Sequence, residues 1–247
     1  MEQIVSDNVR YPECIDVSHP SLFQQERWGP FFKKLRDEDP IHFCASSPYG
    51  PYWSITRYSE IKEIELDHET FSSALGGVRI DNGLRSGFLS SDPPQHTEQR
   101  RTVAPIAATE NLLKYEVLIR ERTANLISEL PENEDFDWND RVASELTIMM
   151  LSTMMDFPQA DRRKLAQWSD ALLCDLRDPD APVKTKNQRD AVLQEIGATF
   201  TTMIKDRASK PQRYDLLSLI AHSSTFNGIP HDQLLGSILL LITGGYD

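Results

Sequence analysis

His96 and Arg100 are the residues of this sequence whose types and spacing most directly suggest ligand chemistry. On a helix, side chains four residues apart project from one face, so this pair can hold an anion such as a carboxylate through charge-assisted hydrogen bonds. The same spacing also fits an ordinary solvated helix face, because Glu98 and Arg101 stand beside the pair. On spacing alone, the solvated face is the better interpretation.

A second set lies in the last apolar stretch, where Leu240, Thr243, Gly244 and Asp247 have helical spacing and share one stripe. Glycine inside a helix costs about 1 kcal/mol, so Gly244 needs a physical reason. One reason is a flat cofactor that approaches the backbone there. Two others are close packing against another helix and a C-cap, which Gly244 and Gly245 together also fit. Asp247 could likewise be an ordinary solvated carboxylate.

The first third of the chain carries the only sheet that the sequence predicts. A helix is expected over residues 26–37, and β-branched and aromatic residues predict strands over 41–45 and 52–58 around a Pro/Gly-rich hairpin loop. A helix over 60–66 follows. The glycine-rich residues 75–89 predict a long loop, and loops of this length often bind ligands.

From residue 92 onward the pattern is almost entirely helical. Ser91 or Asp92 can cap a helix that has Pro93 and Pro94 in its first turn. Further helices are expected over residues 112–130, 142–155, 160–174, 187–209 and 215–222, and from Pro230 to the end of the chain. The fold class is therefore mainly α with a small β-sheet near the N-terminus.

Composition excludes several classes of function. The 247 residues contain 26 Lys+Arg against 38 Asp+Glu, a net charge of −12 that argues against a nucleic-acid partner. No signal peptide, membrane anchor or membrane-spanning stretch is visible, so we expect a cytoplasmic protein. The three cysteines, Cys14, Cys44 and Cys174, form no zinc or redox motif and receive no role. Phosphate-binding loops, dinucleotide fingerprints and nucleophile elbows are also absent from the sequence.

Taken in order, these features resemble the N-terminal part of a bacterial cytochrome P-450, a haem-thiolate monooxygenase. The resemblance covers essentially the whole chain and rests on three segments: Gly50-Pro-Tyr-Trp-Ser-Ile-Thr-Arg-Tyr58, Asp92-Pro-Pro-Gln-His96-Thr-Glu-Gln-Arg100, and Leu239-Leu-Leu-Ile-Thr-Gly-Gly-Tyr-Asp247. It implies one partial cytochrome P-450 domain over residues 1–247 that is truncated within the long distal helix.

The resemblance also assigns roles by position. It implies that His96 and Arg100 bind the propionates of haem b, that Gly244 and Gly245 face the haem, and that Asp247 joins a proton relay. The substrate pocket would be lined by Ile80, Leu84, Phe88, Leu89, Leu240 and Thr243, apolar apart from the threonine. No metal ligand is expected in this chain, because the family's cysteine ligand would lie beyond residue 247.

The implied activity is insertion of one oxygen atom of O2 into an unactivated C–H bond of an apolar substrate. Local similarity around Phe136 and Met155 points to the alkane and fatty-acid terminal hydroxylases, supplied with electrons by a ferredoxin and an NAD(P)H-dependent ferredoxin reductase. We expect this chain to be an inactive fragment. The alternative is an all-helical binding module without a cofactor, which would be colourless.

Overall fold

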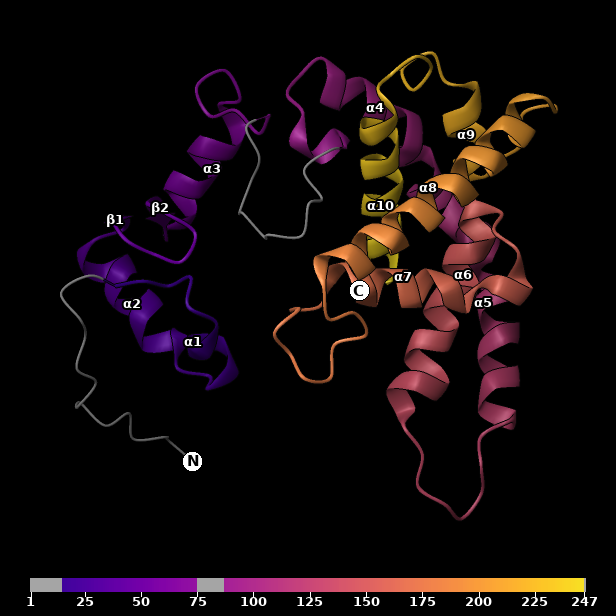
Figure 1. The fold of residues 1–247 in the computed structure, drawn as a ribbon, viewed down its shortest axis with the longest axis horizontal. Coiled ribbons are helices and arrows are strands. Elements are labelled where there is room, and N and C mark those ends of the chain that lie inside the picture. Colours follow the sequence, from indigo (N-terminus) through magenta and orange to yellow (C-terminus); the bar gives the residue numbers. More distant parts are fainter. Residues whose placement is uncertain (1–14, 75–86, 247) are drawn as a thin grey trace. The chain divides into compact units, whose positions relative to one another are not determined.

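The computed structural model describes residues 15–74 and 87–246 of the chain. Two compact units are present, Met1–Ser72 and Ser73–Asp247, and each has its own buried apolar cluster. Helices dominate both units, and the one sheet in the described residues lies in the first unit (Figure 1). The prediction of a mainly α fold with a small N-terminal sheet is therefore confirmed.

The first unit consists of a β-hairpin that follows two helices and precedes a third in the chain. Its elements are α1 (Pro20–Gln24), α2 (Trp28–Glu38), β1 (Ile41–Cys44), β2 (Tyr52–Ile55) and α3 (Tyr58–Leu66). The strands pair antiparallel, with Ile41 opposite Ile55, and so form the hairpin that the sequence predicts. Helix α1 was not predicted, because five residues are too few to reveal a helical period.

The second unit holds seven α-helices in its described part, with four short helical turns (η) between some of them. In chain order its elements are η1 (Phe88–Ser90), α4 (Gln95–Val103), η2 (Ala104–Ala107), α5 (Thr109–Ser128), η3 (Asn139–Ser144), α6 (Glu145–Met155), η4 (Gln159–Asp161), α7 (Arg163–Leu173), α8 (Lys186–Ala208), α9 (Leu216–His222) and α10 (His231–Tyr246). Among the described residues, no helix is long and apolar enough to cross a membrane.

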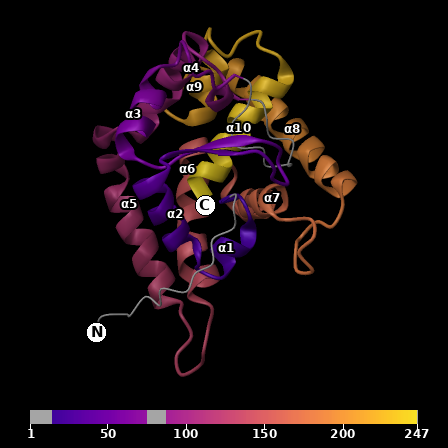
Figure 2. The ribbon, with the colours of Figure 1, turned by 90° about the vertical axis from the view of Figure 1, so that its left-hand side faces the viewer.

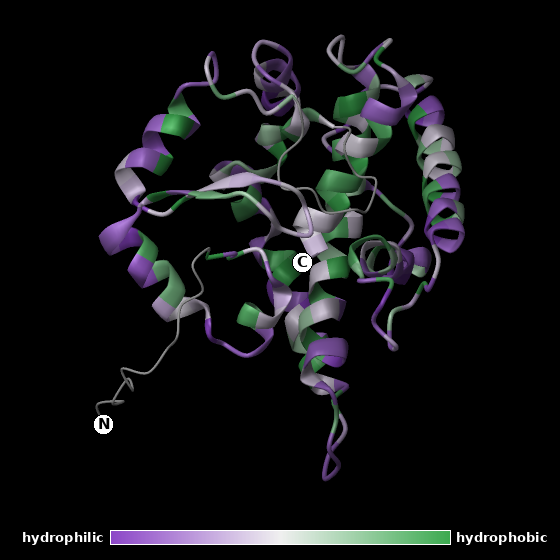
Figure 3. Cartoon of the chain, turned by 60° about the vertical axis from the view of Figure 1, so that its left-hand side comes forward, coloured by the Kyte–Doolittle hydropathy of each residue, from purple (hydrophilic) through white to green (hydrophobic). Residues whose placement is uncertain are grey.

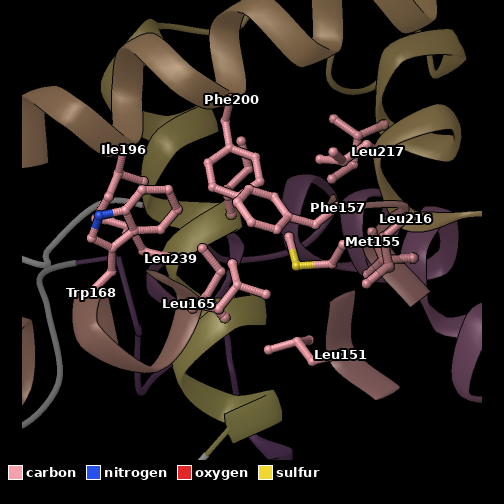
Figure 4. Packing of buried hydrophobic residues seen from close by; sticks show 14 of the residues in the cluster. Leu151, Met155, Phe157, Leu165, Trp168, Ile196, Phe200, Leu216, Leu217 and Leu239 are labelled. Atoms are coloured by element: carbon pink, nitrogen blue, oxygen red, sulfur yellow. The ribbon is translucent and has the colours of Figure 1, made fainter. Parts of the chain in front are cut away.

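Helix α10 runs through the middle of this unit and packs against η1, α6, α7 and α8 (Figure 2). It is apolar on nearly every side, which is the pattern of a helix surrounded by others. Around it lies an aromatic cluster in which the ring of Phe157 is 5.9 Å from that of Trp168 and 5.8 Å from that of Phe200 (Figure 4). This core fixes α10 firmly, so its free faces are well defined.

Two predicted boundaries were wrong. The helix expected from residue 92 begins at Gln95, and neither Ser91 nor Asp92 is its N-cap; Pro94 holds that position. The Asp92 carboxylate instead accepts the backbone N–H of Ser73 at 2.8 Å. Before α6, the chain forms a π-helical turn at η3, a hydrogen-bonding pattern that leaves no recognisable spacing in a sequence.

Helices α5 and α6 lie side by side and are joined by a long loop (Figure 1). The Arg122 side chain ties them together, because its Nη1 donates to the Met149 carbonyl at 2.6 Å. Burial lowers the pKa of Arg122, and the nearby Arg162 adds to the shift. Helix α6 has five buried residues, whereas α5 has none. Hydrophobic and hydrophilic residues both occur along the helices of the chain (Figure 3).

Candidate functional site

Helix α4 presents His96 and Arg100 on neighbouring turns, as their spacing predicts. The His96 side chain is half-buried and that of Arg100 is exposed. Within the described part of the chain, neither side chain has a hydrogen bond or an ion pair, whereas most other arginines of this unit pair with a carboxylate or a carbonyl. Their donors are therefore available to an anionic ligand.

The buried side of α4 carries an unusual polar group. Gln99 is only 2% exposed, and its Nε2 has no hydrogen-bond partner in the described residues. A buried amide donor without an acceptor costs about 1–3 kcal/mol, so it normally marks a place where a further acceptor binds. Because Gln99 lies one helical turn after His96, the orphaned donor flanks the basic pair. No pattern in the sequence singles out Gln99.

On α10, the predicted stripe is only partly covered. Leu240 and Thr243 are half-buried, and the Thr243 hydroxyl donates to the Leu239 carbonyl at 2.9 Å. A Cβ added to Gly244 would meet no atom within 4 Å among the described residues. The helix continues to Tyr246, so Gly244 lies within the helix and not at its C-cap.

Gly245 has a different environment from Gly244. A Cβ at this position would lie 2.8 Å from Leu151 Cδ1 of α6. The close-packing alternative therefore accounts for Gly245, whereas Gly244 keeps a face on which a flat group could rest. Asp247, the predicted relay acid, lies outside the described residues.

The predicted substrate loop is described only at its C-terminal end, since Ile80 and Leu84 lie outside the described residues. Phe88 is 5% exposed and belongs to the apolar core of the second unit. Its place in the substrate pocket stays a prediction. Leu89, by contrast, is 60% exposed and is free to contact one.

The structure brings α4 and α10 together through η1, which packs on both helices. The Phe88 ring lies 6.4 Å from the His96 ring. A second link runs directly between the helices, because Gln95 Nε2 donates to Gln233 Oε1 at 3.0 Å. The basic pair and the Gly244 stripe are thus held on connected elements, which the sequence alone did not reveal.

Residues 15–74 and 87–246 contain no group of three or more His, Cys, Asp or Glu side chains arranged to hold a metal ion. Cys44 is buried and donates to the Ser46 carbonyl at 3.3 Å, and Cys174 donates to the Ala171 carbonyl at 3.4 Å.

Known proteins share the sequence pattern and the fold of this chain. No protein-family model matches the chain. It is 30% identical over 230 residues to cytochrome P450 119 of Sulfolobus acidocaldarius and 27% identical over 248 residues to linalool 8-monooxygenase of Pseudomonas putida. The two alignments cover 87% and 93% of this chain, but 56% and 60% of the relatives.

Among solved structures, CYP153D17 from Sphingomonas sp. PAMC 26605 superposes with a TM-score of 0.79 at 34% identity, covering 94% of this chain and 59% of that one. This mainly helical fold matches those of solved cytochrome P450 structures. The chain belongs to the cytochrome P450 family, and it spans less than two thirds of the length of the relatives that it matches.

Proposed function

We propose that this chain is the distal, propionate-binding part of a haem monooxygenase that hydroxylates an unactivated C–H bond of an apolar substrate. The observation that carries the proposal is the unpaired His96 and Arg100 on α4, held through η1 to a helix whose stripe at Gly244 is open. Two cationic or neutral donors beside a flat, largely apolar wall suit a planar macrocycle with carboxylates at its edge.

In this proposal, His96 and Arg100 hold the haem propionates and Gly244 lets the ring approach α10. When bound, haem supplies the oxidation: with two electrons and two protons, one oxygen atom of O2 enters the C–H bond and the other leaves as water. The protein's own part is to hold the carboxylates, keep water from the apolar wall and deliver protons. Asp247 is the acid that we assign to proton delivery.

The substrate side is built from Leu240 and Thr243 of α10 together with Leu89, and Ile80 and Leu84 complete the proposed lining. These side chains are mostly apolar, so they suit a hydrocarbon chain better than a polar metabolite. The likeness to linalool 8-monooxygenase and to CYP153D17 supports an apolar substrate. An alkane or fatty acid hydroxylated at its terminal carbon is our specific choice.

The remaining parts of the reaction come from elsewhere. Reducing equivalents would pass, in the cytoplasm, from NAD(P)H through a ferredoxin reductase and a ferredoxin. As the family resemblance implies, we assign the axial thiolate to a cysteine outside these 247 residues. We therefore expect the 247 residues alone not to hydroxylate any substrate.

The test compares the complete reading frame that contains these residues with its variants. The parent should take up haem and show, when reduced under carbon monoxide, the absorption band after which the family is named. His96→Ala and Arg100→Ala should each weaken haem retention by about 10- to 100-fold, since each removes a hydrogen bond to a charged group worth about 1.5–3 kcal/mol.

The matched control is Arg101→Ala, which removes an exposed arginine from the next position of the same helix. Successive helical positions point about 100° apart, so Arg101 is directed away from the proposed propionates. Haem retention should stay at the parent's level. A colourless parent protein would contradict the proposal and favour the cofactor-free binding module; equal loss in all three variants would contradict the assigned roles of His96 and Arg100.

A further inference from the structure

The residue before η1, Gly87, lies close to the backbone of α10. Gly87 has a φ of +133°, and a Cβ added to it would lie 2.8 Å from the carbonyl carbon and 2.9 Å from the carbonyl oxygen of Gly236. Both contacts are with backbone atoms, which cannot rotate away as a side chain can. Only glycine therefore fits at position 87 while η1 stays where it is.

Ser237 of α10 holds Phe88, the residue after Gly87, by a hydrogen bond. Its hydroxyl donates to the Gln233 carbonyl at 2.9 Å and at the same time accepts the Phe88 backbone N–H at 3.2 Å. Ser237 is fully buried and Phe88 nearly so. The Phe88 amide would thus have no water to replace this acceptor, and the bond holds η1 to one point along α10.

This contact lies at the start of the proposed ligand wall. Gly236, Leu240, Thr243 and Gly244 are spaced four, three and one residue apart, so they fall along one face of α10. Leu89, whose side chain is exposed, directly follows Phe88, whose amide bonds Ser237. The ring of the same residue, Phe88, lies 6.4 Å from the ring of His96 on α4. Phe88 therefore contacts both α10, through its amide, and α4, through its ring.

We propose that Gly87, Phe88 and Ser237 form an anchor that positions Leu89 and His96 over the Leu240–Gly244 stripe and so decides which carbon atom of a bound hydrocarbon is hydroxylated. The inference rests on the proposed function and adds a specificity determinant to it. The three residues are positioning residues: none of them needs to touch substrate or haem. Their effect passes through Leu89 and His96.

The first measurement needs no cofactor. Hydrogen exchange of the Phe88 amide is followed in the parent chain and in Ser237→Ala, where we expect exchange to become faster by about tenfold or more, because the amide loses its buried acceptor. Thr199→Ala is the control. Like Ser237, Thr199 donates to the carbonyl four residues earlier in its helix, that of Glu195, but it does not accept the Phe88 amide. Equal exchange in Ser237→Ala and the parent would overturn the anchor.

The second measurement uses the complete, haem-loaded enzyme with n-octane as the probe. In Gly87→Ala and Ser237→Ala, the ratio of 1-octanol to 2-octanol should change by about threefold or more, while the carbon monoxide band stays unchanged. A threefold change corresponds to less than about 1 kcal/mol in the relative barriers for the two positions. Gly228→Ala is the matched control for Gly87→Ala, because Gly228 also has a positive φ of +82° but no atom lies within 4 Å of its added Cβ.

The outcomes separate the anchor from the function on which it rests. A changed octanol ratio in both anchor variants, with Gly228→Ala and Thr199→Ala like the parent, supports the inference. Faster Phe88 exchange with an unchanged ratio would overturn it, because the contact would then be structural only. A parent enzyme with no carbon monoxide band would overturn the proposed function, whatever the exchange of the Phe88 amide.

Discussion

Helices α10 and α5 are both rich in large apolar residues, but other elements cover them to very different extents. In α10 five residues are buried, and the helix packs against three other α-helices and η1. In α5, a helix of 20 residues, none is buried. An open groove of about 680 Å³ runs along its surface and is lined by apolar side chains that include Leu112, Leu113, Ile119 and Ile127.

The difference shows what apolar periodicity does and does not determine. It predicts that a segment is helical, and this prediction holds for α5 and α10. It does not determine which element covers the apolar face. For α10 the packing partners are known, so the open space beside Gly244 is informative. For α5 the apolar face is open along most of its length.

The test with the largest expected effect on stability removes side-chain volume from each of the two helices. Ile242 of α10 is 0% exposed and Leu113 of α5 is 62% exposed. Ile242→Ala should lower the free energy of unfolding by about 2–5 kcal/mol, because it leaves a cavity in a packed core. Leu113→Ala should change it by no more than about 0.5 kcal/mol. Urea unfolding of the 247-residue chain measures both, and similar losses would contradict the contrast.

The sequence predicted the helical elements well where their ends are local. Helix α8 was expected over residues 187–209 and spans Lys186–Ala208, where Thr185 and Gln188 form a capping box. Helix α9 begins after Asp215, whose carboxylate accepts the Ser218 N–H at 2.8 Å. Such boundaries depend on residues three or four positions apart, so a sequence displays them directly.

The candidate site was predictable only in part, for a physical reason. The shared face of His96 and Arg100 follows from helical spacing. What joins it to α10 does not: Gln95 and Gln233 are 138 residues apart, and Phe88 and Ser237 are 149 residues apart. Contacts across such distances depend on how the whole core packs. The same holds for Phe88, whose apolar side chain suits a pocket lining as well as a core.

A second test uses the adjacent glycines of α10. Gly245→Ala adds a methyl group 2.8 Å from Leu151 Cδ1, so Leu151 must move, and the overpacking costs about 1–3 kcal/mol against a gain in helix propensity of about 1 kcal/mol. Gly244→Ala gains the propensity without a clash, so it should stabilise the chain by about 0.5–1 kcal/mol. Opposite signs in thermal unfolding are the expected result.

In the complete enzyme the order of the two glycine variants should reverse. Gly244→Ala places a methyl group on the face that we assign to haem and should weaken haem retention, whereas Gly245→Ala should leave it close to the parent's level. A stabilised Gly244→Ala chain that also retains haem normally would argue against Gly244 as the place of close approach.

A third test addresses the open face of α5 directly. Leu113→Lys and Val117→Lys replace side chains that are 62% and 76% exposed. Stability should change by less than about 0.5 kcal/mol, because little buried area is lost. Binding of a hydrophobic dye should fall, since the apolar patch is interrupted. Leu66→Lys on α3, another exposed leucine in the described residues, is the control and should reduce dye binding less.

The smallest expected effect distinguishes the two sides of α5 itself. Burial raises the pKa of Tyr115 above its usual value of 10, and the nearby Tyr214 and Asp215 add to the shift. Since the folded chain keeps this proton more strongly than the unfolded chain does, Tyr115 contributes stability that is full below pH 10 and is lost as the pH rises through the raised pKa.

Tyr115→Phe should therefore flatten the alkaline fall of stability above pH 10, by a fraction of the total change because the side chain is only half-buried. Val117→Ala, on the open side of the same helix, removes no titrating group and should keep the parent's slope. Urea midpoints measured between neutral pH and about pH 11 provide the comparison. Equal slopes in Tyr115→Phe and the parent would show that this side of α5 is no better shielded from water than the side that carries Leu113.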